Sequence, residues 1–186
     1  MNTKNTFLPA GYSIPEGGKP YTRLEQGDNR IRVLGNPIMG MEYWIDVMEN
    51  GKEKRQPIRV RMDEDVETSN IPEPDTLKHF WAMIIWNYNT ARLEVLEITQ
   101  KTIMKAIKAY ASNKAWGDPK GTDGYDFVIT RTGEGLETEY LVTANPKTKL
   151  DKGIVDKFDK SDINIEALFD GEDPFAGTPI NTKEIE

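Results

Sequence analysis

The chain has 186 residues, with 24 Lys and Arg against 31 Asp and Glu, a formal net charge of −7 at pH 7 and no cysteine. The lack of cysteine, together with a single histidine, His79, excludes a Cys/His zinc site, an iron–sulfur cluster, a thiol nucleophile and a disulfide framework. Taken as a total, the negative charge also argues against nucleic acid as a partner, because nucleic acids attract basic proteins.

The first part of the chain predicts an extended arm followed by three strands. Residues 1–20 are rich in Gly and Pro, and from residue 21 apolar and polar residues alternate with the period of a β-strand. Strands are predicted over residues 29–34, 38–48 and 56–62, and Asn50-Gly51 predicts a hairpin turn between the last two.

Alternation also assigns faces within these strands. Two arginine pairs stand at positions i and i+2 of the first and third strands, so each pair leaves its strand on one face: Arg30 with Arg32, and Arg59 with Arg61. Trp44 shares its face of the second strand with Glu42 and Asp46, which favours an exposed ring.

The second part predicts four strands and one helix. Strands are expected over residues 79–88, 92–98, 125–132 and 138–143. Thr99 is expected to cap a helix that runs to about Asn113. Lys101, Lys105 and Lys108 lie at i, i+4 and i+7 and form a basic stripe along it. Seven strands with one helix predict a mainly β domain over residues 21–150, an OB-like Greek-key barrel with additional strands.

The acidic residues are concentrated in two segments. Residues 151–186 carry ten acids and four lysines, and residues 63–75 carry six acids and no basic residue, so each segment has a net charge of −6. The rest of the chain therefore carries +5. Residues 151–186 predict an acidic, largely disordered tail, whose acid-flanked aromatic segment is a candidate for docking a protein partner through Phe169, Asp170, Glu172, Asp173 and Phe175.

The sequence contains no convincing catalytic or metal-binding motif, and we expect no catalytic residue, metal or cofactor. His79 stands beside Phe80 and Trp81, a setting typical of a structural histidine. Pro74-Asp75 followed by Asp118-x-Lys120 superficially resembles a nuclease arrangement, but the spacing is too long. No segment is long and apolar enough for a secretory signal or a membrane span, so we expect a cytoplasmic protein.

Single-stranded nucleic acid requires cations for its phosphates and flat rings for its bases, and this chain has both. We expect cationic side chains from two strands and the helix to contact phosphates, namely Arg30, Arg32, Arg59, Arg61, Lys101 and Lys105. We expect Trp44, Trp81 and Tyr88 to stack on bases.

Several segments together resemble phage-encoded single-stranded DNA-binding proteins. They are YTRLEQGDNRIRVL from Tyr21, GMEYW from Gly40, HFWA from His79, LEITQKTI from Leu96 and TRTGEG from Thr130. The resemblance covers roughly residues 20–145. It implies an OB-fold protein that coats single strands during phage DNA replication, recombination and repair in the infected bacterial cell. It also implies that the tail contacts replication or recombination proteins.

The leading hypothesis is therefore a non-enzymatic, sequence-independent protein that binds single-stranded DNA. Its mobile acidic tail would occupy the basic groove when DNA is absent. The alternative is a protein-interaction module or DNA mimic that acts on a host enzyme through its acidic surface. The position of the arginine pairs separates the two hypotheses: convergence on one concave face favours DNA, and scattered ion pairs favour the alternative.

Overall fold

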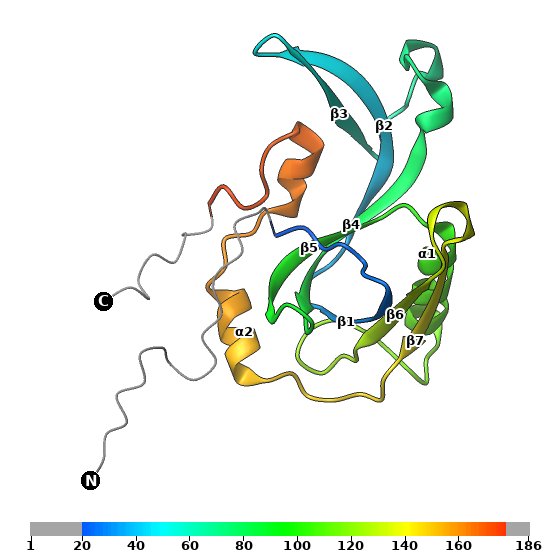
Figure 1. Ribbon diagram of the computed structural model, residues 1–186. Coiled ribbons are helices and arrows are strands. Elements are labelled where there is room, and N and C mark those ends of the chain that lie inside the picture. Colours follow the sequence, from blue (N-terminus) through cyan, green and yellow to red (C-terminus); the bar gives the residue numbers. More distant parts are fainter. Residues whose placement is uncertain (1–19, 178–186) are drawn as a thin grey trace, which may run out of the picture.

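The computed structural model describes residues 20–177, and their fold is mainly β (Figure 1). Seven strands form one antiparallel sheet, which confirms the predicted class. The strands are β1 (Gly27–Val33), β2 (Ile38–Glu49), β3 (Lys52–Arg61), β4 (Lys78–Asn87), β5 (Arg92–Ile98), β6 (Phe127–Thr132) and β7 (Glu139–Ala144). The helices are α1 (Lys101–Ser112), α2 (Lys152–Asp159) and the 3-10 turns η1 (Thr68–Asn70), η2 (Pro74–Thr76), η3 (Gly135–Glu137) and η4 (Ile165–Asp170).

The first two strands behave as two halves of one bent strand. Both strands pair antiparallel with β4. The pairing of β1 ends at Val33, opposite Ile85, and the pairing of β2 begins at Ile38, opposite Ala82. Residues 34–37 therefore lie opposite only residues 83 and 84, so the bent strand bulges at this point. Pro37 suits the bulge because it has no N–H to offer the ladder.

The predicted barrel is not formed. On the side away from β4, β1 pairs with β6 and β2 pairs with β3, while β5 pairs with the other edge of β4. The bend thus sends the β6–β7 and β2–β3 hairpins to opposite ends of the sheet. Within residues 20–177 their outer edges do not meet, and the sheet stays open.

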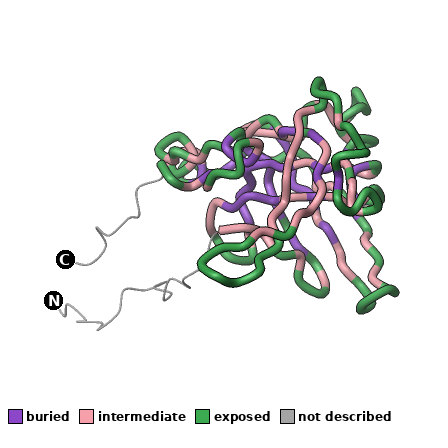
Figure 2. The backbone as a smooth tube through the Cα atoms, turned by 90° about the horizontal axis from the view of Figure 1, so that it is seen from above, coloured by how far each residue is buried: buried purple, intermediate pink, exposed green. Residues whose placement is uncertain are grey.

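The two faces of the sheet carry separate cores. Figure 2 shows the buried segments in the middle of the fold. On one face, which we call the α1 face, Met83 and Ile85 of β4 pack with Ile103 and Ile107 of α1. On the other, the C-terminal face, the alternate residues of β4 pack against α2 and η4. α1 forms as predicted, except that its cap position is Gln100 and not Thr99.

The described part of the acidic tail is folded, so the expectation of disorder is wrong for residues 151–177. Asp151 caps α2 by accepting a hydrogen bond from the Gly153 N–H at 2.7 Å. Ile154, Ile165 and Leu168 are buried in the C-terminal face. These apolar residues are too sparse to make a core alone, but they are sufficient to complete one that the sheet already presents. Residues 1–19 and 178–186 lie outside the described part of the chain.

A buried carboxylate joins β1 to β6. Asp126 accepts hydrogen bonds from Arg32 Nε at 2.6 Å and Arg30 Nη2 at 2.6 Å, and from the Tyr88 hydroxyl at 3.1 Å. The side chains of Arg32 and Asp126 are 1% and 2% exposed. Arg32 also donates to the carbonyl oxygens of Gly121 and Thr148, so this network ties two loops to the sheet.

Removing the carboxylate should strongly destabilise the protein. In Asp126→Ala, the Arg32 guanidinium remains buried without a counter-charge, and we expect a loss of about 3–5 kcal/mol in the free energy of unfolding. Urea denaturation followed by circular dichroism measures this loss. The control is Glu49→Ala, which breaks an exposed pair with Lys54 and should leave the urea midpoint unchanged. Similar midpoints for both variants would show that the Asp126 network is not a stabilising one.

Candidate nucleic-acid interface

The residues predicted to contact nucleic acid do not form one surface. Trp81, Lys101 and Lys105 lie on the α1 face of the sheet. The other predicted residues lie on the C-terminal face, where Arg32 is paired in register with Trp86, and Tyr88 packs against the same core. That second group comprises Arg30, Arg32, Trp44, Arg59, Arg61 and Tyr88.

Two of the arginines are buried in ion pairs, which does not favour the predicted contact with phosphates. Arg32 is buried on Asp126, as described above. Arg59 is 8% exposed, and it donates from Nε to Glu42 at 2.9 Å and from Nη2 to Glu97 at 2.7 Å. Burial raises the pKa of the Glu97 carboxyl above its ordinary value, and the adjacent Arg59 offsets only part of this rise. Alternation correctly places each arginine pair on one face, but carboxylates on that face engage all four arginines.

Arg30 is half-exposed but already engaged. Its guanidinium bonds to Asp126 and lies 4.2 Å from the centre of the Tyr88 ring. One face of the Tyr88 ring is therefore occupied by a protein cation, and its hydroxyl is bonded to Asp126. Tyr88 is not a free stacking platform in this structure.

Arg61 is half-exposed and is engaged by the C-terminal segment. It forms an ion pair with Glu166 of η4, and its guanidinium lies 4.2 Å from the centre of the Phe169 ring. Phe169 in turn packs on Phe80 with ring centres 5.8 Å apart. Gly40 allows this approach, because a side chain there would come within 2.9 Å of the Phe169 ring.

The residues predicted to dock a partner divide in the same way. The rings of Phe169 and Phe175 are half-buried against the protein itself, Phe175 at 5.7 Å from Tyr21. Asp170 and Glu172 are exposed, whereas Asp173 is half-buried. A partner could reach the exposed acids directly, but the rings only if this segment leaves the sheet. Deleting residues 151–186 would also remove part of the core, so it cannot isolate an inhibitory role of the tail.

Trp44 lies on the side away from α1. Alternation along β2 puts it with Glu42, which binds Arg59 on the C-terminal face. The ring that alternation places on the side of Met39 and Met41 is Tyr43. Trp44 is half-buried and stands opposite Pro57 of β3. It therefore cannot act together with Trp81 in one groove.

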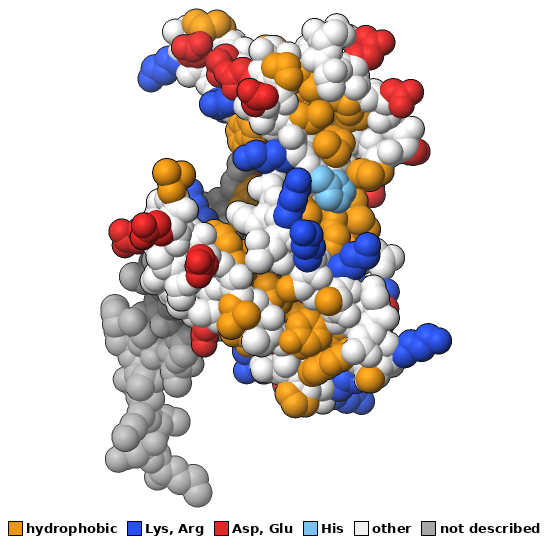
Figure 3. Space-filling model, turned by 90° about the vertical axis from the view of Figure 1, so that its right-hand side faces the viewer, with side chains coloured by type: hydrophobic (Ala, Val, Ile, Leu, Met, Phe, Trp, Pro, Cys, Tyr) orange, Lys and Arg blue, Asp and Glu red, His pale blue; other side chains and the backbone are white. Residues whose placement is uncertain are grey.

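The α1 face holds an open hollow bordered by cations. Figure 3 shows Lys and Arg side chains gathered beside the single histidine, with hydrophobic side chains between them. The hollow has a volume of about 490 Å³ and lies between α1, β4, the bend before β2 and the loop at residues 118–120. Lys108 and Lys120 border it. A second hollow of about 600 Å³, bordered by Lys78 and Lys101, shares His79 with the first.

The lysines of α1 are available to a ligand. Lys101, Lys105 and Lys108 are exposed, and no carboxylate within residues 20–177 pairs with them. Lys120 differs because it pairs with Asp118 at 2.7 Å. Three free cations along one helix face give the α1 face the positive field that phosphates require.

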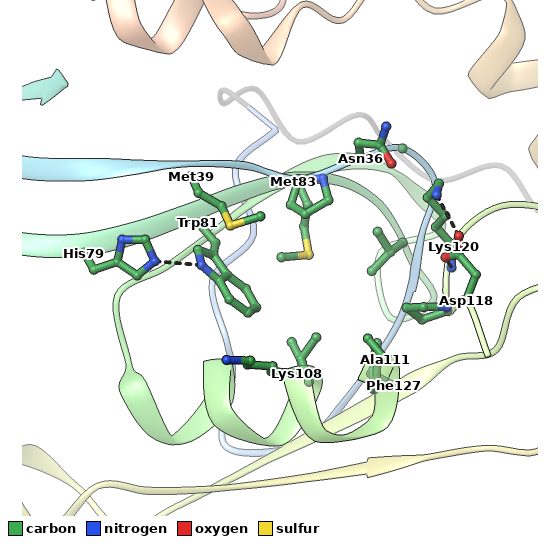
Figure 4. A pocket seen from close by; sticks show the side chains of 15 residues that line it. Asn36, Met39, His79, Trp81, Met83, Lys108, Ala111, Asp118, Lys120 and Phe127 are labelled. Carbon is green, nitrogen blue, oxygen red and sulfur yellow. Dashed lines mark hydrogen bonds and ion pairs between the residues drawn. The ribbon is translucent and has the colours of Figure 1, made fainter. Parts of the chain in front are cut away.

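His79 holds Trp81 in place. The Trp81 Nε1–H donates to His79 Nε2 at 2.9 Å, while His79 Nδ1 lies 2.9 Å from the Gly40 carbonyl oxygen (Figure 4). Nδ1 therefore carries the proton and donates to Gly40, leaving Nε2 as the acceptor. The half-buried indole points into the hollow. The sequence context of His79 predicts a structural histidine, but it gives no sign that His79 positions the ring two residues later on the same strand face.

No known protein family, curated protein or solved structure matches this chain. The resemblance to phage single-stranded DNA-binding proteins therefore remains an expectation based on short segments. None of the helices within residues 20–177 is long and apolar enough to cross a membrane.

Replacing His79 should free the Trp81 indole. In His79→Phe the acceptor is lost but a ring remains, and we expect solvent exchange of the Trp81 indole proton to accelerate about 2- to 10-fold, the worth of one net hydrogen bond. Exchange measured by ¹⁵N–¹H NMR tests this expectation. The control is Lys78→Ala, a change at the exposed neighbouring position. Equal exchange rates in His79→Phe and wild type would show that His79 does not hold the ring.

Proposed function

We propose that this protein binds single-stranded DNA without reading its sequence, and that it coats and protects the strand during phage DNA replication, recombination and repair. The strand would lie along the α1 face. The observation that carries the proposal is the row of three unpaired lysines on α1 beside an open, apolar hollow with a tryptophan in its wall.

The lysines account for affinity. Lys101, Lys105 and Lys108 are spaced along one side of a helix of twelve residues. In a backbone-tracking site, cations of this kind replace the counterions condensed on the phosphates, which makes binding strong at low salt and weak at high salt. Contact with phosphates alone carries no base preference.

Trp81 accounts for the preference for single strands. Its ring is fixed by His79 and partly exposed beside the lysines. Stacking of a base on such a ring is worth about 1–3 kcal/mol and is open to every base, provided that the base is free of its duplex partner. Lysines and ring together favour a single strand of any sequence.

The biological setting of the proposal rests on the resemblance to phage replication proteins. In that setting the protein acts in the cytoplasm of the infected bacterium, without catalysis and without a cofactor. The exposed acids Asp170 and Glu172 remain candidates for contact with replication or recombination proteins. The proposal does not need a closed barrel, because the α1 face is built from one side of an open sheet and a helix.

A protein-interaction module or DNA mimic is the second candidate, and the state of the arginines favours it. Arg30, Arg32, Arg59 and Arg61 are all engaged in ion pairs, and the two that are half-exposed, Arg30 and Arg61, match the surface ion pairs expected for that alternative. The acidic segment at residues 63–65 is exposed and could present carboxylates to a host enzyme. The free lysines of α1 are the feature that this alternative leaves unexplained.

Titration with oligo(dT) tests the proposal. We expect quenching of tryptophan fluorescence and a slope of log K against log[salt] of about −0.7 for each neutralised phosphate. Changing Lys101, Lys105 and Lys108 together to Ala should reduce the magnitude of that slope by about 2.

The matched control changes three lysines on the opposite face, Lys152, Lys157 and Lys160, to Ala. This variant should keep the wild-type slope. No binding by the wild-type protein at low salt would defeat the proposal, and an equal loss in both triple variants would show that the α1 face is not the binding surface.

A further inference from the structure

We propose that the hollow beside α1 is a base pocket: one base of the bound strand leaves the stack of its neighbours and enters it, against Trp81. This inference rests on the proposed function and adds to it a specific site. It also commits the hollow to one occupant, a base of single-stranded DNA.

The interior of the hollow suits a flat apolar ring. Trp81, Met39 and Met83 form one wall, and Ala111 of α1 lies across from them (Figure 4). Ile107 of α1 also lines the hollow. The Met sulfurs point toward the space between the walls, and thioethers make favourable contacts with aromatic rings. The volume of about 490 Å³ falls within the range of small-ligand sites.

The mouth of the hollow suits the phosphates that flank such a base. Lys108 borders it from α1 as an unpaired cation, and Lys120 borders it from the loop after Gly117. Asp118 is the only carboxylate among the lining residues, and it is neutralised by Lys120 at 2.7 Å. An apolar interior with an unpaired lysine at its rim is complementary to a base carried on a charged backbone, and a lipid chain or apolar peptide would not need that lysine.

The bend between β1 and β2 explains why there is space for a base. Gly35, Asn36 and Pro37 belong to the bulge opposite β4, and all three line the hollow. A regular strand would fill this position with alternating side chains. Because the Val33 carbonyl oxygen is bonded to the Gly121 N–H at 2.9 Å, the loop holds the bend open from its other side.

The test uses Ala111→Leu, which narrows the hollow from the α1 side, with Ala109→Leu as its matched control. Both alanines are exposed on α1, but only Ala111 lines the hollow. Affinity of each full-length protein is measured by anisotropy for labelled oligo(dT) and for an abasic strand of the same length at one low salt concentration. We expect Ala111→Leu to bind oligo(dT) about 5- to 150-fold more weakly than wild type, the effect of losing one stacked base.

The abasic strand makes the test specific to a base. It has phosphates but nothing to insert, so the loss caused by Ala111→Leu should disappear on it, while Ala109→Leu should match wild type on both strands. Met39→Ala, which removes contact area from the opposite wall, should show a smaller loss that also disappears on the abasic strand. Because Met39 is 44% exposed, its replacement should cost little stability. Met39→Ala therefore keeps the test valid if Ala111→Leu unfolds at a lower temperature than wild type.

The outcomes separate this inference from the proposed function. If wild type binds oligo(dT) and both Ala111→Leu and Met39→Ala bind it as tightly as wild type, the base pocket is overturned. The proposed binding of the strand along the α1 face is then unaffected. A loss of the same size on both strands also overturns the pocket, since it would report a contact with the backbone. If wild type binds neither strand, the proposed function itself fails.

Discussion

The bend between β1 and β2 is the constraint on which the remaining structure depends. One partner strand, β4, pairs with both halves, yet residues 34–37 lie opposite only two residues of it. Since each half also carries a different neighbour on its far side, the sheet spreads into two hairpins and cannot close. The same bulge lines the hollow on the α1 face. An open sheet and a candidate site thus have one geometric cause.

The two faces of this open sheet serve different purposes. The C-terminal face uses its arginines internally, on Asp126, Glu42, Glu97 and Glu166, and it is covered by α2 and η4. The α1 face keeps its lysines free. This division reconciles a net charge of −7 with a basic surface, because charges paired on one face contribute little field at the other.

The arginine pairs show the limit of strand alternation as a guide to function. Alternation correctly groups Arg59 with Arg61 on one face, but it does not tell whether water or protein covers that face. The deciding partners lie far away in the chain, with Asp126 94 residues from Arg32 and Glu166 105 residues from Arg61. The basic stripe on α1 follows from the sequence more directly, because its spacing depends on one helix alone.

The sequence by itself determined the local structure of this protein: the strands and their two faces, the Asn50-Gly51 hairpin turn, and the helix with its basic stripe. These follow from periods of two and of 3.6 residues, which neighbouring residues set among themselves. Only the tertiary structure decided that the sheet stays open, that the acidic tail folds onto it, and that His79 fixes Trp81 beside a hollow. Each of these depends on which surfaces distant segments bury together, and packing of that kind leaves no period in the sequence.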